Sequence, residues 1–138
     1  MKSGLKALLI MVWLVGGCAA TGPNVTGDST SQLQTRQIQT RQYETLDKNM
    51  TMRSVIATLQ DLGFVIDDAN PKLGTITATR LHEYPMRMTV TVVNKGEKQV
   101  SVRVNARIDE NSVTDARTYQ DFFVALDKAM FLTLNKVD

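Results

Sequence analysis

The sequence has few of the residues that most often build active sites and metal centres. Its 138 residues include one cysteine and one histidine, so an intramolecular disulfide is excluded and a Cys- and His-rich metal site is not expected. No Gly-x-Ser-x-Gly motif, phosphate-binding P-loop or dinucleotide fingerprint occurs. The longest apolar run is shorter than the roughly 20 residues that a membrane-spanning helix needs. The sequence therefore predicts no cofactor, no metal and no catalytic residue, and it argues against an enzyme.

Two stretches that resemble reactive sites have simpler interpretations. His82 lies beside Glu83 in a stretch typical of a loop, and an acid–base pair would also need a third group and a pocket. Asp67 begins an acidic segment, but an EF-hand calcium loop starting there would require Gly and Glu where Lys72 and Ala78 stand. We expect a solvated loop in the first case and a solvated turn in the second.

The N-terminus has the layout of an export signal that ends at the only cysteine. Lys2 and Lys6 precede an apolar run over residues 7–15, and two glycines and Cys18 follow. A basic segment, an apolar segment and a cleavage site of small residues are the three parts of a secretory signal. Residues 1–17 are therefore predicted to be a signal peptide.

The end of this signal, Val15–Cys18, resembles the lipobox of bacterial lipoproteins, with Val where Leu is more usual and Gly where Ala or Ser is common. The resemblance implies that the Cys18 thiol receives diacylglycerol, that the chain is cut before Cys18, and that fatty acid such as palmitate is added to the freed amine. In lipoproteins of this kind, Asp directly after the cysteine is the signal for retention in the inner membrane. This chain has Ala19 at that position, so the resemblance favours the periplasmic side of the outer membrane of a Gram-negative bacterium. The alternative is an ordinary signal that happens to contain a cysteine.

The chain after the signal is predicted to have a tether and one domain. Residues 18–34 are rich in Ser, Thr, Gly, Ala and Gln, so they are expected to form a flexible tether behind the lipidated cysteine. Residues 35–138 are long enough for one hydrophobic core. The two lysines of the signal account for the excess of 16 basic over 14 acidic side chains. The remaining chain has a formal charge of zero, and we expect no nucleic acid partner.

Alternation of apolar and polar residues predicts strands, and spacings of three and four predict helices. The expected strands are 37–45, 64–66, 75–79, 86–93 and 100–108, with a loop at 67–74 and a hairpin turn at 94–98. A helix is expected from Met50 to Leu62, capped by Asn49 or Thr51 and ended by Gly63. A second helix is expected over 114–134, favoured at its start by Asp115. The predicted buried stripes comprise Met52, Val55, Ile56, Leu59 and Leu62 in the first helix and Tyr119, Phe122, Phe123, Leu126, Met130 and Leu134 in the second.

The element order β-α-β-β-β-β-α predicts an α+β fold, a two-layer sandwich whose antiparallel sheet of about five strands has both helices on one face. Three segments, Met52–Leu59, Leu62–Phe64 and Gly74–Ala78, resemble the helix-grip domains of the C-subunit lipoprotein of the outer-membrane β-barrel assembly machine. The layout is also similar to that of the lipopolysaccharide-assembly lipoprotein. These resemblances imply the fold and the compartment, and they transfer no binding residues.

The polar face of the predicted sheet has three arginines, Arg87, Arg103 and Arg107. Their neighbours on that face are Thr75, Thr77, Thr79, Thr89, Thr91, Ser101 and Asn105. Guanidinium groups bind carboxylate and phosphate through paired N–H donors, so this face is a candidate ligand site. The alternative is a solvated sheet face with residues of high strand propensity. The face has no aromatic residues on which single-stranded nucleic acid bases would stack.

Val124 and Phe131 lie beside the buried stripe of the second predicted helix. They would either cover a sheet edge or contact a partner. Taken together, these observations favour a non-enzymatic lipoprotein, anchored to the membrane through Cys18, that serves as an accessory or scaffold subunit of an envelope complex for outer-membrane assembly, export or efflux. The alternative is a binding module for a small anionic or glycan ligand, which would use the arginine- and threonine-bearing face of the sheet.

Overall fold

The computed structural model describes residues 25–82 and 84–135, with side chains from residue 31 onward. The signal peptide, Cys18 and the start of the predicted tether lie outside these residues. The described chain has three helices and six strands. In order they are α1 Val25–Ile38, β1 Thr40–Tyr43, α2 Lys48–Asp61, β2 Val65–Asn70, β3 Thr75–Arg80, β4 Met86–Lys95, β5 Gln99–Ile108, β6 Asn111–Ser112 and α3 Ala116–Leu134.

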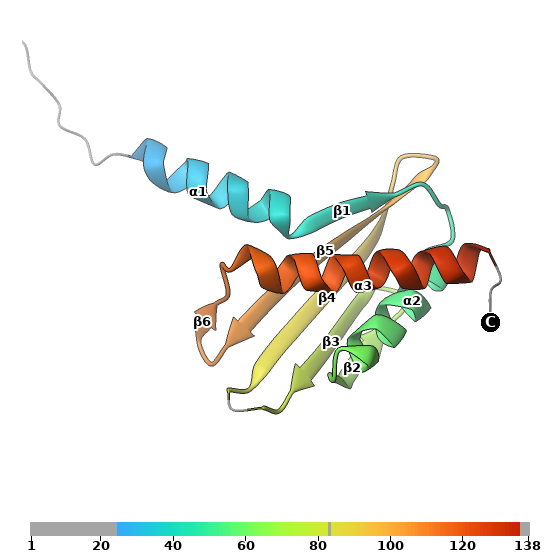
Figure 1. Ribbon diagram of the computed structural model, residues 1–138. Helices are drawn as coiled ribbons and strands as arrows, with labels where there is room; N and C mark the ends of the chain where they lie inside the picture. The colour runs from blue at the N-terminus through green and yellow to red at the C-terminus, as the bar shows by residue number, and fades with distance from the viewer. Residues whose placement is uncertain (1–24, 83, 136–138) are drawn as a thin grey trace, which may run out of the picture.

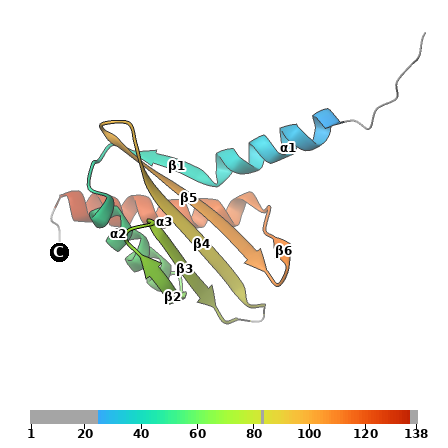
Figure 2. The same cartoon turned by 180° about the vertical axis from the view of Figure 1, so that it is seen from behind.

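The strands form one antiparallel sheet in the spatial order β1-β5-β4-β3-β2, and the short β6 pairs with the end of β5. Helices α2 and α3 cover one face of this sheet (Figure 1), and the opposite face carries no helix when the molecule is turned round (Figure 2). The predicted α+β fold, with two helices on one face of an antiparallel sheet, is therefore confirmed. The sequence did not predict α1 or β6.

The alternation in β4 and β5 separates the two faces as expected. Every second residue is buried under the helices, and the residues between them are exposed or half-buried, apart from Ser101. The buried set is Met86, Met88, Val90 and Val92 in β4 and Val100, Val102, Val104 and Ala106 in β5. Ser101 lies on the polar face but is buried, between Gln42 on one neighbouring strand and Val93 on the other.

Helix α2 starts two residues earlier than predicted, and its cap is Asp47 rather than Asn49 or Thr51. The Asp47 carboxylate accepts a hydrogen bond of 2.7 Å from the Met50 amide, and its carbonyl accepts one from the Thr51 hydroxyl. Aspartate is as good a cap as asparagine, so the choice depends on where the chain enters the helix. Gly63, with φ at +83°, follows the helix as predicted.

The predicted buried stripes are largely confirmed. Met52, Val55 and Leu59 of α2 are buried, and Ile56 and Leu62 are half-buried against the same core. Five of the six residues predicted for α3 are buried, namely Tyr119, Phe122, Phe123, Leu126 and Met130. The exception is Leu134, which is 56% exposed. The last turn of α3 contacts α2 through the Thr133 and Ser54 hydroxyls, 3.4 Å apart.

The loop predicted at 67–74 is too long. Strand β2 continues to Asn70 because Asp68, Ala69 and Asn70 pair with β3, which satisfies their backbone groups. The register shifts between Ile66 and Asp68, so Asp67 is the extra residue of a bulge. The turn proper comprises residues 71–74.

The expected flexible tether and first strand are also partly wrong. Residues 25–34 are helical as part of α1, and the first strand is confined to Thr40–Tyr43 within the predicted 37–45. The apolar residues of this segment are too few and too widely spaced to form a stripe that would predict a helix. Ile38 packs against the core, and the buried Gln39 side chain donates a hydrogen bond of 3.0 Å to the Tyr119 hydroxyl. These contacts join the end of α1 to the domain.

Val124 and Phe131 are 60% and 63% exposed, so they do not cover a sheet edge. Contact with a partner stays a prediction for this pair. Among the described residues, no helix combines the length and the apolar character needed to cross a bilayer.

Candidate functional site

The uncovered face of the sheet contains all three predicted arginines, and strand register decides which of them lie together. Arg87 of β4 stands directly opposite Arg107 of β5, whereas Arg103 stands opposite Thr91. Arg103 is four residues along β5 from Arg107, which is about 13 Å at the rise of a strand. The structure thus brings two of the three arginines together and leaves the third apart.

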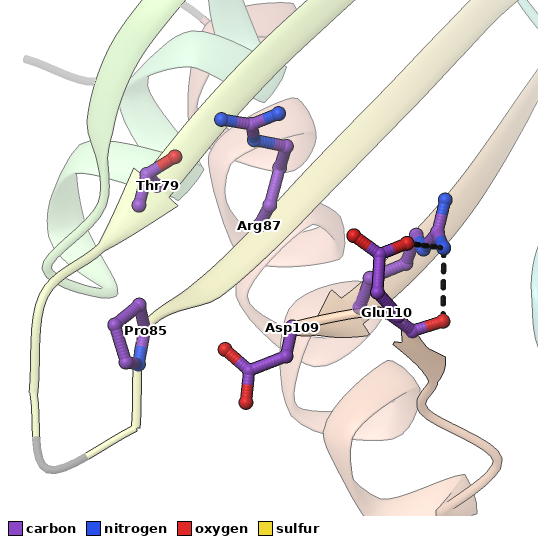
Figure 3. Close-up of a pocket in the computed structure, with 6 residues that line it drawn as sticks. Thr79, Pro85, Arg87, Asp109 and Glu110 are labelled. Atoms are coloured by element: carbon purple, nitrogen blue, oxygen red, sulfur yellow. Dashed lines mark hydrogen bonds and ion pairs between the residues drawn. The ribbon is translucent and has the colours of Figure 1, made fainter.

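Arg87 and Arg107 line a hollow of about 380 Å³ at the end of the sheet where β5 turns into β6 (Figure 3). Its other lining residues are Thr79, Pro85, Asp109 and Glu110. Thr79 stands opposite Arg87 on β3, and Ser112 of β6 stands opposite Arg107. A row of hydroxyl, guanidinium, guanidinium and hydroxyl side chains therefore crosses four strands on the same face.

The charges around the hollow are only partly paired. One terminal nitrogen of the Arg107 guanidinium donates to the Glu110 carbonyl at 2.9 Å and contacts a Glu110 carboxylate oxygen at 3.3 Å. Arg87 and Asp109 have no ion pair or hydrogen-bond partner among the side chains that the structure describes. Figure 3 shows the Asp109 carboxylate on the side toward Pro85, away from the paired Glu110. The hollow has one free cation and one free anion.

Asp109 has an unusual backbone. It is the only residue other than glycine with positive φ, at +52°, in the part of the chain that the structure describes. Ile108 and Asn111 pair with each other, so Asp109 and Glu110 form a two-residue turn between β5 and β6. Such turns favour glycine, asparagine and aspartate at positions with positive φ.

The Thr79 hydroxyl is already used as a donor. It gives a hydrogen bond of 2.6 Å to a carboxylate oxygen of Asp67, the bulge residue of β2. The oxygen of Thr79 still has acceptor capacity toward the hollow. The Asp67 carboxylate, predicted to be solvated in a turn, thus bonds to the neighbouring strand β3. The Asn70 side chain accepts a hydrogen bond of 3.0 Å from the Leu73 amide within the following turn.

A second polar cluster lies on the helix side of the sheet and was not predicted. Asp127 of α3 accepts a hydrogen bond of 2.8 Å from the Tyr43 hydroxyl and forms an ion pair with Arg41. The Arg41 guanidinium also lies 4.8 Å from the centre of the Phe123 ring. Burial raises the pKa of Tyr43 well above its ordinary value, and the hydrogen bond and charge of Asp127 act in the same direction. This cluster joins β1 to α3.

The structure assigns no site to the other described residues that the sequence analysis considered for catalysis or metal binding. His82 is exposed, and Glu83 lies outside the described residues. Within 25–82 and 84–135, no three His, Cys, Asp or Glu side chains are placed to hold a metal ion. Cys18, the predicted lipidation site, also lies outside the described part.

Sequence reasoning did not single out Pro85, Asp109 or Glu110 as site residues. The available signal was the polar run Asp109-Glu110-Asn111 directly after the last alternating residue of β5, which marks a tight turn at the end of the arginine-bearing strand.

No family model matches this chain, and no curated protein is similar enough to count as a relative.

Proposed function

We propose that this protein is a lipid-anchored, non-enzymatic accessory or scaffold subunit of an envelope complex, held by Cys18 on the periplasmic side of the outer membrane. The observation that carries the proposal is the position of the only cysteine directly after an export signal with a lipobox-like end. Two or more acyl chains on one residue give stable membrane attachment, whereas one chain holds only weakly.

The arrangement of the domain is compatible with an anchor of this kind. Helix α1 begins seven residues after Cys18 and projects away from the sheet (Figure 1). Its 14 residues span about 21 Å at the rise of an α-helix. An anchor at Cys18 would therefore place the sandwich some distance from the bilayer, with the uncovered face of the sheet and the outer side of the helix layer accessible to other envelope proteins.

Metabolic labelling with a fatty acid tests the anchor. The Cys18→Ser variant is expected to lose all label, while Ala19→Ser, which keeps the cysteine, is expected to keep it. Label retained by Cys18→Ser would contradict lipidation at this residue. Separation of inner and outer membranes then tests the location, and Ala19→Asp is expected to move the protein toward the inner-membrane fraction.

Crosslinking in intact cells, followed by purification of the anchored protein, tests the scaffold role. We expect one or a few envelope proteins to be recovered with the parent chain and to be reduced with Cys18→Ser. Recovery of no envelope protein above the background of an untagged strain would contradict the proposal.

A second candidate function is a binding module for a small anionic or glycan ligand. It is favoured by the register that sets Arg87 against Arg107 on the uncovered face. In this function, replacement of Arg87 and Arg107 by Ala removes ligand binding while the envelope contacts persist, and Arg103→Ala has a smaller effect because it lies outside the hollow.

A further inference from the structure

One departure from local structural preference occurs in the hollow. Like charges directly opposite each other on neighbouring strands are destabilising, yet Arg87 faces Arg107. Positions where local preference is overridden concentrate at functional sites. Both arginines line the hollow of about 380 Å³, and so does Asp109 from the turn after β5.

The charges of the hollow indicate what it would bind. Glu110 is paired with Arg107, so the unpaired groups are the Arg87 guanidinium and the Asp109 carboxylate. The four ionisable side chains sum to a formal charge of zero, and a simple anion would meet the free carboxylate as well as the arginines. A ligand that has an anionic and a cationic group would satisfy both.

We propose that this hollow binds a small zwitterion in which a phosphate is linked to a primary ammonium, as in phosphoethanolamine. The inference rests on the second candidate function above and narrows its ligand. The phosphate oxygens accept from Arg87 and from the N–H groups of Arg107 that Glu110 does not use. The ammonium donates to Asp109. Two guanidiniums suit the several oxygens of a tetrahedral phosphate better than the two of a carboxylate.

The size of the hollow agrees with this class of ligand. Pockets for small molecules begin at roughly 300 Å³, and the hollow is near that lower limit at about 380 Å³. The same chemistry occurs in a soluble phosphoethanolamine ester and in the headgroup of a phospholipid. The chain leaves the sheet toward α1 beside β5, where the Gln39 carbonyl accepts from the Val104 amide. The end of α1 and the hollow therefore lie on the same half of the sheet.

Calorimetric titration of the acylated protein, purified in uncharged detergent, tests the proposal. The probe is glycerophosphoethanolamine, and glycerol phosphate and ethanolamine are the comparison ligands. We expect the zwitterion to bind at least about tenfold more tightly than either comparison ligand, because glycerol phosphate lacks the bond to Asp109 and ethanolamine lacks the bonds to both arginines. A repeat in micelles containing phosphatidylethanolamine separates the two sources, because a bound lipid headgroup would displace the soluble probe.

Matched variants locate the site. Arg87→Ala and Asp109→Asn are each expected to weaken binding of glycerophosphoethanolamine at least about tenfold, and Arg103→Ala to leave it within about twofold. Asp109→Gly removes the carboxylate at a backbone position that glycine prefers, so it is expected to fold normally and still lose binding. Circular dichroism checks the fold of each variant.

Two results would overturn the proposal in different ways. Equal binding of glycerol phosphate and glycerophosphoethanolamine, with no effect of Asp109→Asn, would reject the zwitterion and leave a plain anion site. Binding of none of the three probes would reject the hollow as a phosphate-binding site altogether. Neither result bears on lipidation of Cys18, which the fatty-acid label tests separately.

Discussion

Aromatic side chains on the same helix have very different environments at the scale of single residues. Phe122 of α3 is 0% exposed and contacts Phe123 edge to face, with ring centres 5.3 Å apart. Phe131, nine residues on, is 63% exposed. The difference follows from the angle that each residue takes around the helix relative to the sheet.

This difference predicts contrasting effects of the same substitution. Phe122→Ala is expected to lower the free energy of unfolding by about 3–5 kcal/mol, because it leaves a cavity in the core. Phe131→Ala is expected to change it by no more than about 0.5 kcal/mol. Urea unfolding followed by circular dichroism measures both. Equal losses for the two variants would mean that Phe131 is buried in solution, for example against a partner.

Tyr43 predicts a dependence of stability on alkaline pH. Burial and the neighbouring Asp127 raise its pKa in the folded state, so the neutral phenol favours the fold. This contribution is fully present below the pKa of an unfolded tyrosine, near 10, and is lost as the pH rises above that value. Between about pH 9 and 11, the free energy of unfolding should therefore decrease more steeply with pH for the parent chain than for Tyr43→Phe. Urea unfolding at a series of pH values measures this.

The comparison has an internal control. All other ionisable side chains are the same in both proteins, so their contributions cancel in the difference. At neutral pH the Tyr43→Phe variant loses the hydrogen bond to Asp127 and is expected to be about 0.5–1.5 kcal/mol less stable. A pH profile identical in shape for both proteins would contradict the raised pKa.

The sequence predicted which face of the sheet the arginines of the candidate site would lie on. It did not predict which residues would be their neighbours on adjacent strands. Alternation along β4 and β5 was sufficient to place Arg87, Arg103 and Arg107 on the polar face. It could not say that Arg87 and Arg107 are direct partners, since that depends on the register between two strands. The position of Asp109 in the site could not be predicted from the local sequence pattern either, because it depends on a turn that forms only when β6 pairs with β5.

At the scale of elements, the turns that join the strands differ in how closely other parts of the chain approach them. Gly74 ends the turn between β2 and β3 with φ at +74°, and its carbonyl accepts from the Val92 amide at 2.7 Å. A Cβ atom at Gly74 would lie 2.1 Å from the Val92 carbonyl oxygen. Gly96, in the hairpin between β4 and β5, has a similar φ of +67° and no atom within 4 Å of a Cβ built there.

These two glycines are a matched pair for substitution. Gly96→Ala is expected to cost about 1–2 kcal/mol of unfolding free energy, from the backbone conformation alone. Gly74→Ala adds a steric clash with β4 and is expected to cost about 2–5 kcal/mol in total. Thermal or urea unfolding of both variants provides the measurement. A Gly74→Ala protein as stable as Gly96→Ala would show that β4 and the β2–β3 turn are not in close contact.

The elements differ in how well local pattern predicts them. Strands β3, β4 and β5 and helix α3 have long, regular alternation or spacing, and the sequence located them within a few residues. The boundaries of β2 and the existence of α1 were missed. Asp67 and Asp68 disfavour a strand, and β2 forms there because β3 supplies its hydrogen bonds. The polar α1 has no stripe to recognise.

At the scale of the whole molecule, α1 is expected to be the least stable part of the described chain. Its 14 residues are near the lower limit for an independent helix, and Gln32, Leu33 and Gln34 are exposed. Strands β4 and β5 are at the centre of the sheet and under both helices. Hydrogen exchange read by mass spectrometry should therefore label α1 long before β4 and β5, which exchange only on global unfolding.

An opposite result would be informative in itself. Protection of the α1 amides comparable to that of β5 would mean that α1 packs against another surface in solution. The same measurement on the acylated protein in a bilayer would test whether anchoring at Cys18 adds protection to α1.

The sequence by itself determined the two faces of the sheet and the buried stripes of the helices, because periods of 2 and about 3.6 are properties of each element alone. It also holds the only indication of an anchor, in the residues around Cys18. The tertiary structure decided which charged groups meet. Pairing of β4 with β5 and of β5 with β6 involves backbone hydrogen bonds between separate segments, and these set Arg87 beside Arg107 and carry Asp109 to the edge of their hollow.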